Sequence, residues 1–384
     1  MYMSAASTDL NHFLDTLAKD AKPGDRVPPV RDLMRRFGVS QIVVQHALDR
    51  LKTKRLIESQ VGRGTFFTAH GQTLDASAAE APAAVRSVLL LRRSVSIVRG
   101  RVVVDGLLRR FAAEGHRVLE VSYTDSEHAR AVLKGLPRFD ACVIQSSFES
   151  IAIETLAAVR QKTDVVVVDG VALVGAEVDA VGLEWGEPLA TAIRLLVKQG
   201  HRSIAFATTS HPFLANELAR RRLEELRGTL TDVDLQSVAV PRLPQQDLEG
   251  ALVAMLKERL DASGRLPFTA LVAWGIEDGA RFREQLSRAG LAIPSTLSVV
   301  LLGRADLANE HADFFDVVGC NAADQIEYLH EAIGARWADP FRAYGIRFLP
   351  VVTRAGASIG NPPGAARRST HPAVSVAAKR RAQA

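Results

Sequence analysis

The chain of 384 residues is long enough for two or three domains, and its apolar fraction of 47% with 24% charged residues is typical of a globular protein. No run of eighteen or more apolar residues occurs, and the first twenty residues lack the basic-then-apolar build of a secretion signal. These features predict a cytoplasmic protein without a membrane span. Cys142 and Cys320 each lie in an apolar strand-like run, which favours reduced, buried thiols over a disulfide.

The net charge of +5 is distributed unevenly along the chain. Residues 1–70 contain 11 Lys and Arg against 7 Asp and Glu, and residues 362–384 contain five basic residues and no acidic one. The long region between them is mildly acidic. A small basic domain beside a larger acidic one indicates a polyanion as the partner of the small domain.

Residues 8–68 predict three short helices followed by a β-hairpin. "TDLNHFLDTLAKDA" has one apolar face, and "VRDLMRRFG" is a second short helix ended by Gly38. The third helix, in "VSQIVVQHALDRL", carries an apolar stripe at i, i+3, i+4 and i+7 formed by Val44, Ala47, Leu48 and Leu51. "LIESQVGRGTFFTA" reads as two strands joined around Gly62–Gly64. This outline is that of a winged helix-turn-helix domain, residues 1–70.

Two glutamines, Gln41 and Gln45, lie one turn apart on the polar side of the third helix. In a helix-turn-helix the second helix of the motif enters the DNA major groove, and a glutamine amide can pair with the N6 and N7 atoms of adenine. These glutamines are therefore candidate base readers; the alternative is a solvated helix face with uncommitted amides. The candidate phosphate ligands are Arg31, Arg35, Arg36 and Lys52, and Arg63 at the hairpin tip is expected in a minor groove or on another phosphate.

The stretch "PGDRVPPVRDLMRRFGVSQIVVQHALDRLKTKRLIESQVGRGTFF" resembles the GntR family of bacterial transcription regulators along almost its whole length. The resemblance rests on PGD-x-x-P, R-x-L-x-x-x-FGVS, V-x-x-AL-x-x-L and the GRGTF hairpin, in this order and spacing. It implies binding of double-stranded operator DNA as a dimer, with Arg31 and Ser40 in backbone and turn contacts and Gly62, Arg63 and Gly64 at the wing tip. Gln41 and Gln45 stand where the family usually has arginine, which moves the expected readout from guanine towards adenine.

Residues 71–85 are rich in Ala, Ser and Pro without periodicity and are expected to be a linker. From residue 86 to 361 apolar strands alternate with helical patterns, and three helices end on a glycine before the next strand (Gly115, Gly200 and Gly290). The strand runs lack polar alternation, as expected of parallel strands covered on both faces, and include "SVLLL", "RVLEV", "ACVIQ", "DVVVVD", "SIAFA", "ALVAW" and "LSVVLL". The length predicts two doubly wound α/β lobes. The basic tail, residues 362–384, is expected to be disordered.

The large region resembles the LacI/GalR effector domain, which has the fold of type 1 periplasmic sugar-binding proteins. The residues that carry this resemblance include "FDACVIQSS", "DVVVVDG" and "FTALVAWGIEDGARFREQLSRAGLAIPSTLSVVLLG". It implies a sugar-responsive repressor that dimerises through this domain. Two departures bear on the ligand: Gly275-Ile276 replaces Asn-Asp, and Leu301-Leu302-Gly303 followed by Arg304 replaces Gly-Phe-Asp. The loss of two aspartates and the gain of Trp274 and Arg304 favour a less hydroxyl-rich or an anionic ligand; the alternative is that no ligand binds at all.

Ligands of open α/β lobes bind beyond the carboxyl ends of the strands, here between the lobes. That rule nominates polar strand-end residues and one aromatic ring, which together suit a small polar effector such as a sugar or a sugar acid. The candidates are Ser94, Ser96, Gln145, Ser146, Asp169, Arg220, Arg221, Arg222 and Trp274. For each of them a plain strand-end or surface role is the alternative.

The sequence contains no nucleophile elbow, no metal-ligand spacing and no phosphate-cradling glycine loop. We therefore expect no enzyme, no metal and no cofactor. Two other interpretations stay open: a DNA-binding regulator without a small-molecule effector, and a binding protein that uses the winged helix for protein contacts.

Overall fold

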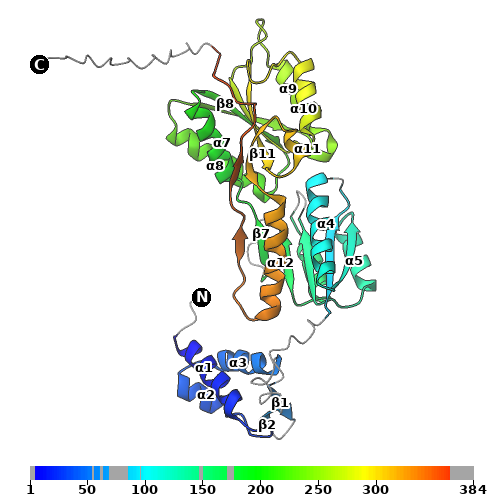
Figure 1. The fold of residues 1–384 in the computed structure, drawn as a ribbon, viewed down its shortest axis with the longest axis vertical. Helices are drawn as coiled ribbons and strands as arrows, with labels where there is room; N and C mark the ends of the chain where they lie inside the picture. Colours follow the sequence, from blue (N-terminus) through cyan, green and yellow to red (C-terminus); the bar gives the residue numbers. More distant parts are fainter. Residues whose placement is uncertain are drawn as a thin grey trace, which may run out of the picture.

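The computed structural model describes residues 5–53, 56–60, 64–68, 85–95, 97–146, 150–170 and 177–363. The described chain forms a small N-terminal unit and a two-lobed α/β unit (Figure 1). The predicted linker falls largely outside these ranges, and so does the predicted tail from residue 364 onward. Both therefore remain expectations.

The N-terminal unit consists of three helices and an antiparallel hairpin, as the sequence predicts. Its elements are α1 (Ala5–Asp20), α2 (Val30–Phe37), α3 (Gln41–Thr53), β1 (Ile57–Gln60) and β2 (Gly64–Phe67). The stripe of α3 packs with Leu10, Leu14 and Leu33 in one buried cluster. The helix α2 ends at Gly38, whose φ of 63° is the left-handed conformation that stops a helix. The structure therefore confirms the predicted buried face of α3 and the predicted end of α2 at Gly38.

The first lobe is built on a six-stranded sheet in the order β13-β7-β6-β5-β3-β4, with all neighbouring strands parallel. Helices α4 and α12 cover one face, and α5 and α6 cover the other. The elements are β3 (Ser87–Arg93), α4 (Val98–Ala113), β4 (Arg117–Tyr123), α5 (Ser126–Gly135), β5 (Ala141–Gln145), α6 (Ile153–Arg160), β6 (Val166–Asp169), β7 (Asp179–Gly182), α12 (Ala322–Ala338) and β13 (Ile346–Phe348).

The second lobe has a sheet of the same size in the order β14-β12-β11-β10-β8-β9, in which only β14 runs antiparallel to its neighbour among the described strands. Helices α7 and α8 lie on one face, and α9, α10 and α11 lie on the other. The elements are α7 (Gly186–Lys198), β8 (Ser203–Thr209), α8 (Leu214–Thr229), β9 (Asp234–Val240), the 3-10 turn η2 (Pro244–Gln246), α9 (Leu248–Glu258), β10 (Ala270–Trp274), α10 (Gly279–Arg288), β11 (Ser298–Arg304), α11 (Ala308–His311), β12 (Asp316–Cys320) and β14 (Val352–Arg354).

The chain passes between the lobes after β7, after β12 and between β13 and β14. One cluster of buried side chains runs through both lobes at these passages. Every residue of β5, β6, β10 and β11 is buried, which explains why these strands read as uninterrupted apolar runs in the sequence. Cys142 and Cys320 are buried free thiols, as predicted.

Candidate DNA-binding surface and interlobe site

The helix α3 presents Gln41 and Gln45 on one side of the N-terminal unit. Gln41 is exposed in the first turn, and Gln45 is half-buried, with its amide nitrogen 3.3 Å from an Asp49 carboxylate oxygen. Ser40 is exposed directly before the helix. The buried stripe of α3 faces α1 and α2, so the glutamines are left on the side that can meet another molecule.

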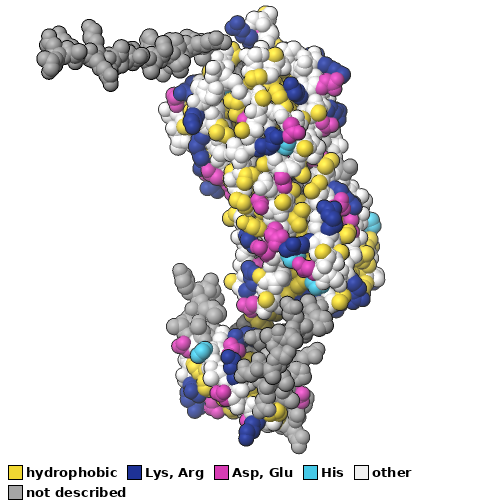
Figure 2. All heavy atoms as spheres, viewed as in Figure 1, with side chains coloured by type: hydrophobic (Ala, Val, Ile, Leu, Met, Phe, Trp, Pro, Cys, Tyr) yellow, Lys and Arg dark blue, Asp and Glu magenta, His cyan; other side chains and the backbone are white. Residues whose placement is uncertain are grey.

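Three of the predicted phosphate ligands lie on α2, and a fourth, Lys52, lies in the last turn of α3. Arg31, Arg35 and Arg36 are exposed on α2, and the Arg36 guanidinium lies 4.0 Å from the centre of the Phe13 ring. Lys52 forms an ion pair with Asp49 at 3.2 Å. Figure 2 shows several dark blue Lys and Arg side chains on the face of the N-terminal unit that this view presents. Exposed Lys and Arg side chains are the residue types that bind a phosphate backbone.

One arginine that sequence reasoning missed, Arg26, lies against the wing. Gly64 is the first residue of β2, whereas Gly62 and Arg63 lie outside the described residues. A Cβ atom added to Gly64 would lie 3.0 Å from the Arg26 Nε atom, so the exposed Arg26 side chain lies against the wing. Arg26 also forms a β-bridge with Phe66. The signal for Arg26 was present in the "PGDR" segment, but only the folded hairpin brings it beside the wing.

In the first lobe, the structure brings together three of the predicted effector residues at the carboxyl ends of β5 and β6. The Gln145 amide nitrogen donates to Asp169 Oδ2 at 3.0 Å and to the Gly100 carbonyl at 3.1 Å. The Ser146 hydroxyl donates to the Asp169 carbonyl at 3.0 Å. Asp169 is only 7% exposed, and burial raises its pKa, opposed by hydrogen bonds from Gln145 and Gln325 and by the charge of Arg304.

Two further residues extend this group across to the second lobe. Gln325 on α12 donates its amide hydrogen to Asp169 Oδ1 and accepts at its oxygen from Arg304 Nη2 at 2.6 Å. Arg304 ends β11 of the second lobe and is only 8% exposed. The polar chain Gln145–Asp169–Gln325–Arg304 therefore joins the strand ends of both lobes. Sequence reasoning named Arg304 as a departure from the resemblance but did not place Gln325 in the site.

A second interlobe contact, which we call the Arg99 latch, consists of Arg99, Glu277 and Glu310. The Nε atom of Arg99, on α4 of the first lobe, lies 3.5 Å from Glu277 Oε1 and 3.3 Å from Glu310 Oε1, both in the second lobe. Arg99 Nη2 donates to the Ile276 carbonyl at 2.9 Å, and the Val98 amide donates to Glu277 Oε2 at 3.2 Å. Burial raises the pKa of Glu277, and the charge of Arg99 lowers it. None of the three was predicted from the sequence.

The absence of a side chain at residue 303 allows a carboxylate to enter from α11. A Cβ atom on Gly303 would lie 2.3 Å from Glu310 Oε2, which accepts a hydrogen bond from the Arg304 amide at 2.8 Å. Glu310 thus occupies space beside the end of β11, where the family resemblance led us to expect an aspartate. The carboxylate has not been lost from this strand end; it comes from a different element.

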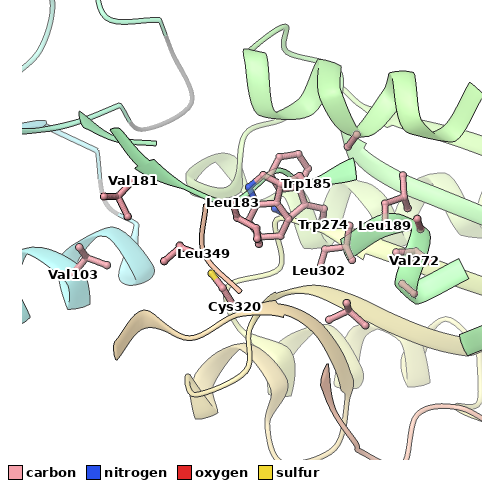
Figure 3. Close-up of a cluster of buried hydrophobic side chains, with 14 of the residues drawn as sticks. Val103, Val181, Leu183, Trp185, Leu189, Val272, Trp274, Leu302, Cys320 and Leu349 are labelled. Atoms are coloured by element: carbon pink, nitrogen blue, oxygen red, sulfur yellow. The ribbon is translucent and has the colours of Figure 1, made fainter. Parts of the chain in front are cut away.

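The other predicted effector residues are dispersed. Trp274 is 4% exposed and packs against Trp185, with ring centres 4.6 Å apart, inside the core shared by the lobes (Figure 3). Ser94 is exposed and lines a pocket of about 500 Å³ together with Arg92, Arg101 and Gln145, and Ser96 lies outside the described residues.

The three arginines of α8 diverge. Arg220 donates to the Thr209 carbonyl at 3.2 Å, whereas Arg221 is an exposed side chain paired with Glu225, and Arg222 pairs with Glu187 and Glu225. They do not form a single cationic cluster.

Within the described residues, no group of three His, Cys, Asp or Glu side chains is arranged to hold a metal ion. No helix in that part of the chain is both long and apolar enough to cross a bilayer.

Comparisons with known proteins identify both parts of the chain. Residues 15–67 match the family described as "Bacterial regulatory proteins, gntR family", and residues 193–314 match the "Periplasmic binding protein-like domain". A comparison with curated protein sequences finds no match.

Solved structures similar to this chain include LacI family transcriptional regulators. One from Enterococcus faecium with bound ribose has a TM-score of 0.58 and 14% identity, covering 72% of this chain and 99% of that one. One from Weissella paramesenteroides with bound sucrose has a TM-score of 0.56 and 17% identity, with the same coverage. One from Arthrobacter sp. FB24 in complex with lactose has a TM-score of 0.57 and 13% identity, covering 72% and 100%. The chain therefore joins a GntR-type helix-turn-helix domain to a two-lobed periplasmic-binding-protein-like domain. This combination of domains is that of a DNA-binding transcription regulator.

Proposed function

We propose that this protein is a ligand-responsive repressor that binds a near-palindromic operator as a homodimer in the cytoplasm. The observation that carries the proposal is the surface of α3, where exposed Gln41 and half-buried Gln45 stand beside the exposed arginines of α2, in a segment that matches the gntR family. Residues 1–70 would bind DNA, residues 71–85 would link, and residues 86–361 would dimerise and bind the effector. Half-sites are expected about one helical turn apart.

The effector is expected between the lobes, at the polar chain Gln145–Asp169–Gln325–Arg304. These side chains lie where ligands of open α/β lobes bind, and the LacI family structures named above hold ribose, sucrose and lactose. A small polar molecule of the sugar or sugar-acid class fits such a set of donors and acceptors. Ligand-dependent movement of the lobes would change the spacing of the two winged helices, and a coupling of about 1–3 kcal/mol would change operator affinity by roughly 5- to 150-fold.

DNA binding is tested by selecting fragments from random duplexes and then titrating the selected duplex at increasing salt. With five candidate phosphate ligands per protomer (Arg31, Arg35, Arg36, Lys52 and Arg63), the slope of log affinity against log salt is expected to be roughly −4 to −5 per protomer. Failure to retain any duplex at low salt would favour a role of the winged helix in protein contacts.

The switch is tested on the same duplex with a panel of sugars and sugar acids. A ligand that raises the melting temperature of the protein is expected also to change operator affinity. A regulator without an effector would show neither effect with any member of the panel.

A further inference from the structure

We infer that the interlobe site takes an anionic effector, a carboxylate-bearing polyol, and that Arg304 is the residue that selects it. The inference rests on the proposed function, because it names the ligand class of the same site.

The starting observation is a buried guanidinium that forms no direct ion pair with a described carboxylate. Arg304 is 8% exposed, and within the described residues no carboxylate oxygen lies within 4 Å of its guanidinium nitrogens. Nη2 donates to the Gln325 amide oxygen, but Nε and Nη1 have no hydrogen-bond partner among the residues that the structure describes. Burying an ion costs several kcal/mol unless it is paired, and unsatisfied buried donors add to that cost. A bound anion would remove both penalties.

The neighbouring acidic groups are engaged elsewhere. Both carboxylate oxygens of Asp169 accept from amides, Oδ1 from Gln325 and Oδ2 from Gln145. Asp306 accepts from the first two amides of α12, at 2.7 and 3.0 Å. Glu310 faces Arg99 with one oxygen and binds the backbone amide, rather than the guanidinium, of Arg304 with the other. Burial lowers the pKa of Arg304, and the charges of Cys320, Glu310, Asp169 and Asp306 raise it, with a net upward shift. Because none of these carboxylates pairs directly with the guanidinium, its Nε and Nη1 atoms can still bind an anion from outside the chain.

The location of Arg304 couples such a ligand to the arrangement of the lobes. Its backbone belongs to β11 of the second lobe, while its guanidinium reaches Gln325 on α12, which packs on the first lobe. The guanidinium connects the lobes through one direct hydrogen bond, from Nη2 to Gln325. An anion bound by Nε and Nη1 would lie next to this hydrogen bond. Ligand hydroxyls would be bound by the amide and carboxylate groups at the ends of β5 and β6.

The test compares matched neutral and acidic ligands on full-length protein. D-glucose and D-gluconate, D-galactose and D-galacturonate, and glycerol and D-glycerate are titrated by thermal shift and calorimetry. The proteins are wild type, Arg304→Gln, Arg304→Lys and the control Arg288→Gln. Arg288 is 73% exposed on α10, where it pairs with Glu284, and has no part in the site.

The expected result is stabilisation by at least one acid and not by its neutral counterpart. Affinity for that acid should fall roughly 10- to 100-fold in Arg304→Gln, fall less in Arg304→Lys and stay unchanged in Arg288→Gln, since a hydrogen bond to a charged group is worth about 1.5–3 kcal/mol. Without ligand, Arg304→Gln should melt close to the wild-type temperature, because the guanidinium forms no direct ion pair and glutamine keeps an amide donor for Gln325.

Four results would overturn the inference. Equal binding of a neutral sugar and its acid, or unchanged acid binding by Arg304→Gln, would refute anion selection by Arg304 and leave the effector site standing. A marked fall in the melting temperature of ligand-free Arg304→Gln would show that Arg304 serves the fold. Failure of every ligand to bind would count against the effector site itself, while operator binding would remain as a separate measurement.

Discussion

The Arg99 latch yields the sharpest prediction, because one substitution removes the only described cation that contacts both of its carboxylates. We consider Arg99→Met, which keeps much of the side-chain volume and deletes the charge. Glu310 is 2% exposed and the Glu277 side chain is 13% exposed, so neither carboxylate is well hydrated while the lobes are in contact. Breaking one side of a buried ion pair typically costs about 3–5 kcal/mol. The loss of stability in Arg99→Met cannot exceed the free energy needed to separate the lobes, because separation exposes both carboxylates to water.

At about 2–4 °C per kcal/mol for a domain of 150–250 residues, this loss corresponds to a fall of roughly 6–20 °C in the melting temperature of the two-lobed unit at neutral pH. The effect should depend on pH. Burial already raises the pKa of Glu277, and removal of Arg99 deletes the charge that lowers it. A carboxylate whose folded-state pKa is above its unfolded value takes up a proton on folding at pH values between the two. The penalty is therefore absent below the unfolded pKa, grows as pH rises from the unfolded to the folded pKa, and is constant above the folded pKa.

The assay is thermal unfolding of wild type and Arg99→Met at several values between pH 5 and pH 8. The control is Arg101→Met on the same helix, because Arg101 is 51% exposed and its ion pairs with Asp105 and Glu120 are screened by solvent. The gap between wild type and Arg99→Met should widen with pH and shrink when Glu310→Gln is added. A gap that is the same at every pH, or no larger than that of Arg101→Met, would refute the latch.

Three further predictions concern other parts of the chain. Gln41→Ala with Gln45→Ala should weaken binding to a selected operator by roughly 30-fold or more and leave low-salt binding to random duplexes intact, as measured by fluorescence anisotropy, because two amide–base pairs of about 1–3 kcal/mol each are removed. Arg336→Met should cost about 3–5 kcal/mol in urea unfolding, since Arg336 and Asp179 form a 2.7 Å ion pair with both partners almost fully buried, and adding Asp179→Asn should restore part of it. Gly38→Ala should destabilise the N-terminal unit by about 1–2 kcal/mol in hydrogen exchange, because its φ of 63° strains any residue with a Cβ atom. The first prediction would be contradicted if the double glutamine variant kept its choice of target. The second would be contradicted if the effects of Arg336→Met and Asp179→Asn were additive, and the third if hydrogen exchange in Gly38→Ala were unchanged.

Local patterns in the sequence were sufficient to predict most elements. The stripe Val44, Ala47, Leu48 and Leu51 defines the buried side of α3 because residues three and four apart share one face of a helix. The same reasoning leaves Gln41 and Gln45 on the other side, so the candidate DNA surface could be predicted before any contact was known. The apolar strand runs are equally local, since a parallel strand covered on both faces has no solvent side to mark with polar residues.

The interlobe site could be predicted only in part. Asp169 and Gln145 were found because strand ends of a parallel sheet meet at one edge, a rule that needs only the strand positions. Trp274 ends its strand in the same way, yet the structure uses its ring in the core against Trp185. The position of a strand end predicts where the backbone lies, but the direction of the side chain depends on its packing in the folded protein.

The contacts that join the lobes were decided by tertiary structure alone. Arg99 meets the Ile276 carbonyl across 177 residues of sequence, and Gln325 meets Asp169 across 156. No helical or strand period connects residues so far apart, and a Glu or Gln in an amphipathic helix looks the same whether it faces water or another lobe. The sequence by itself determined the helices, the strands and the candidate readers of DNA bases, because each of these is a property of one face of one element. Only the docking of the two lobes placed Arg99 against Glu277 and Glu310 and buried Arg304 without a direct ion pair.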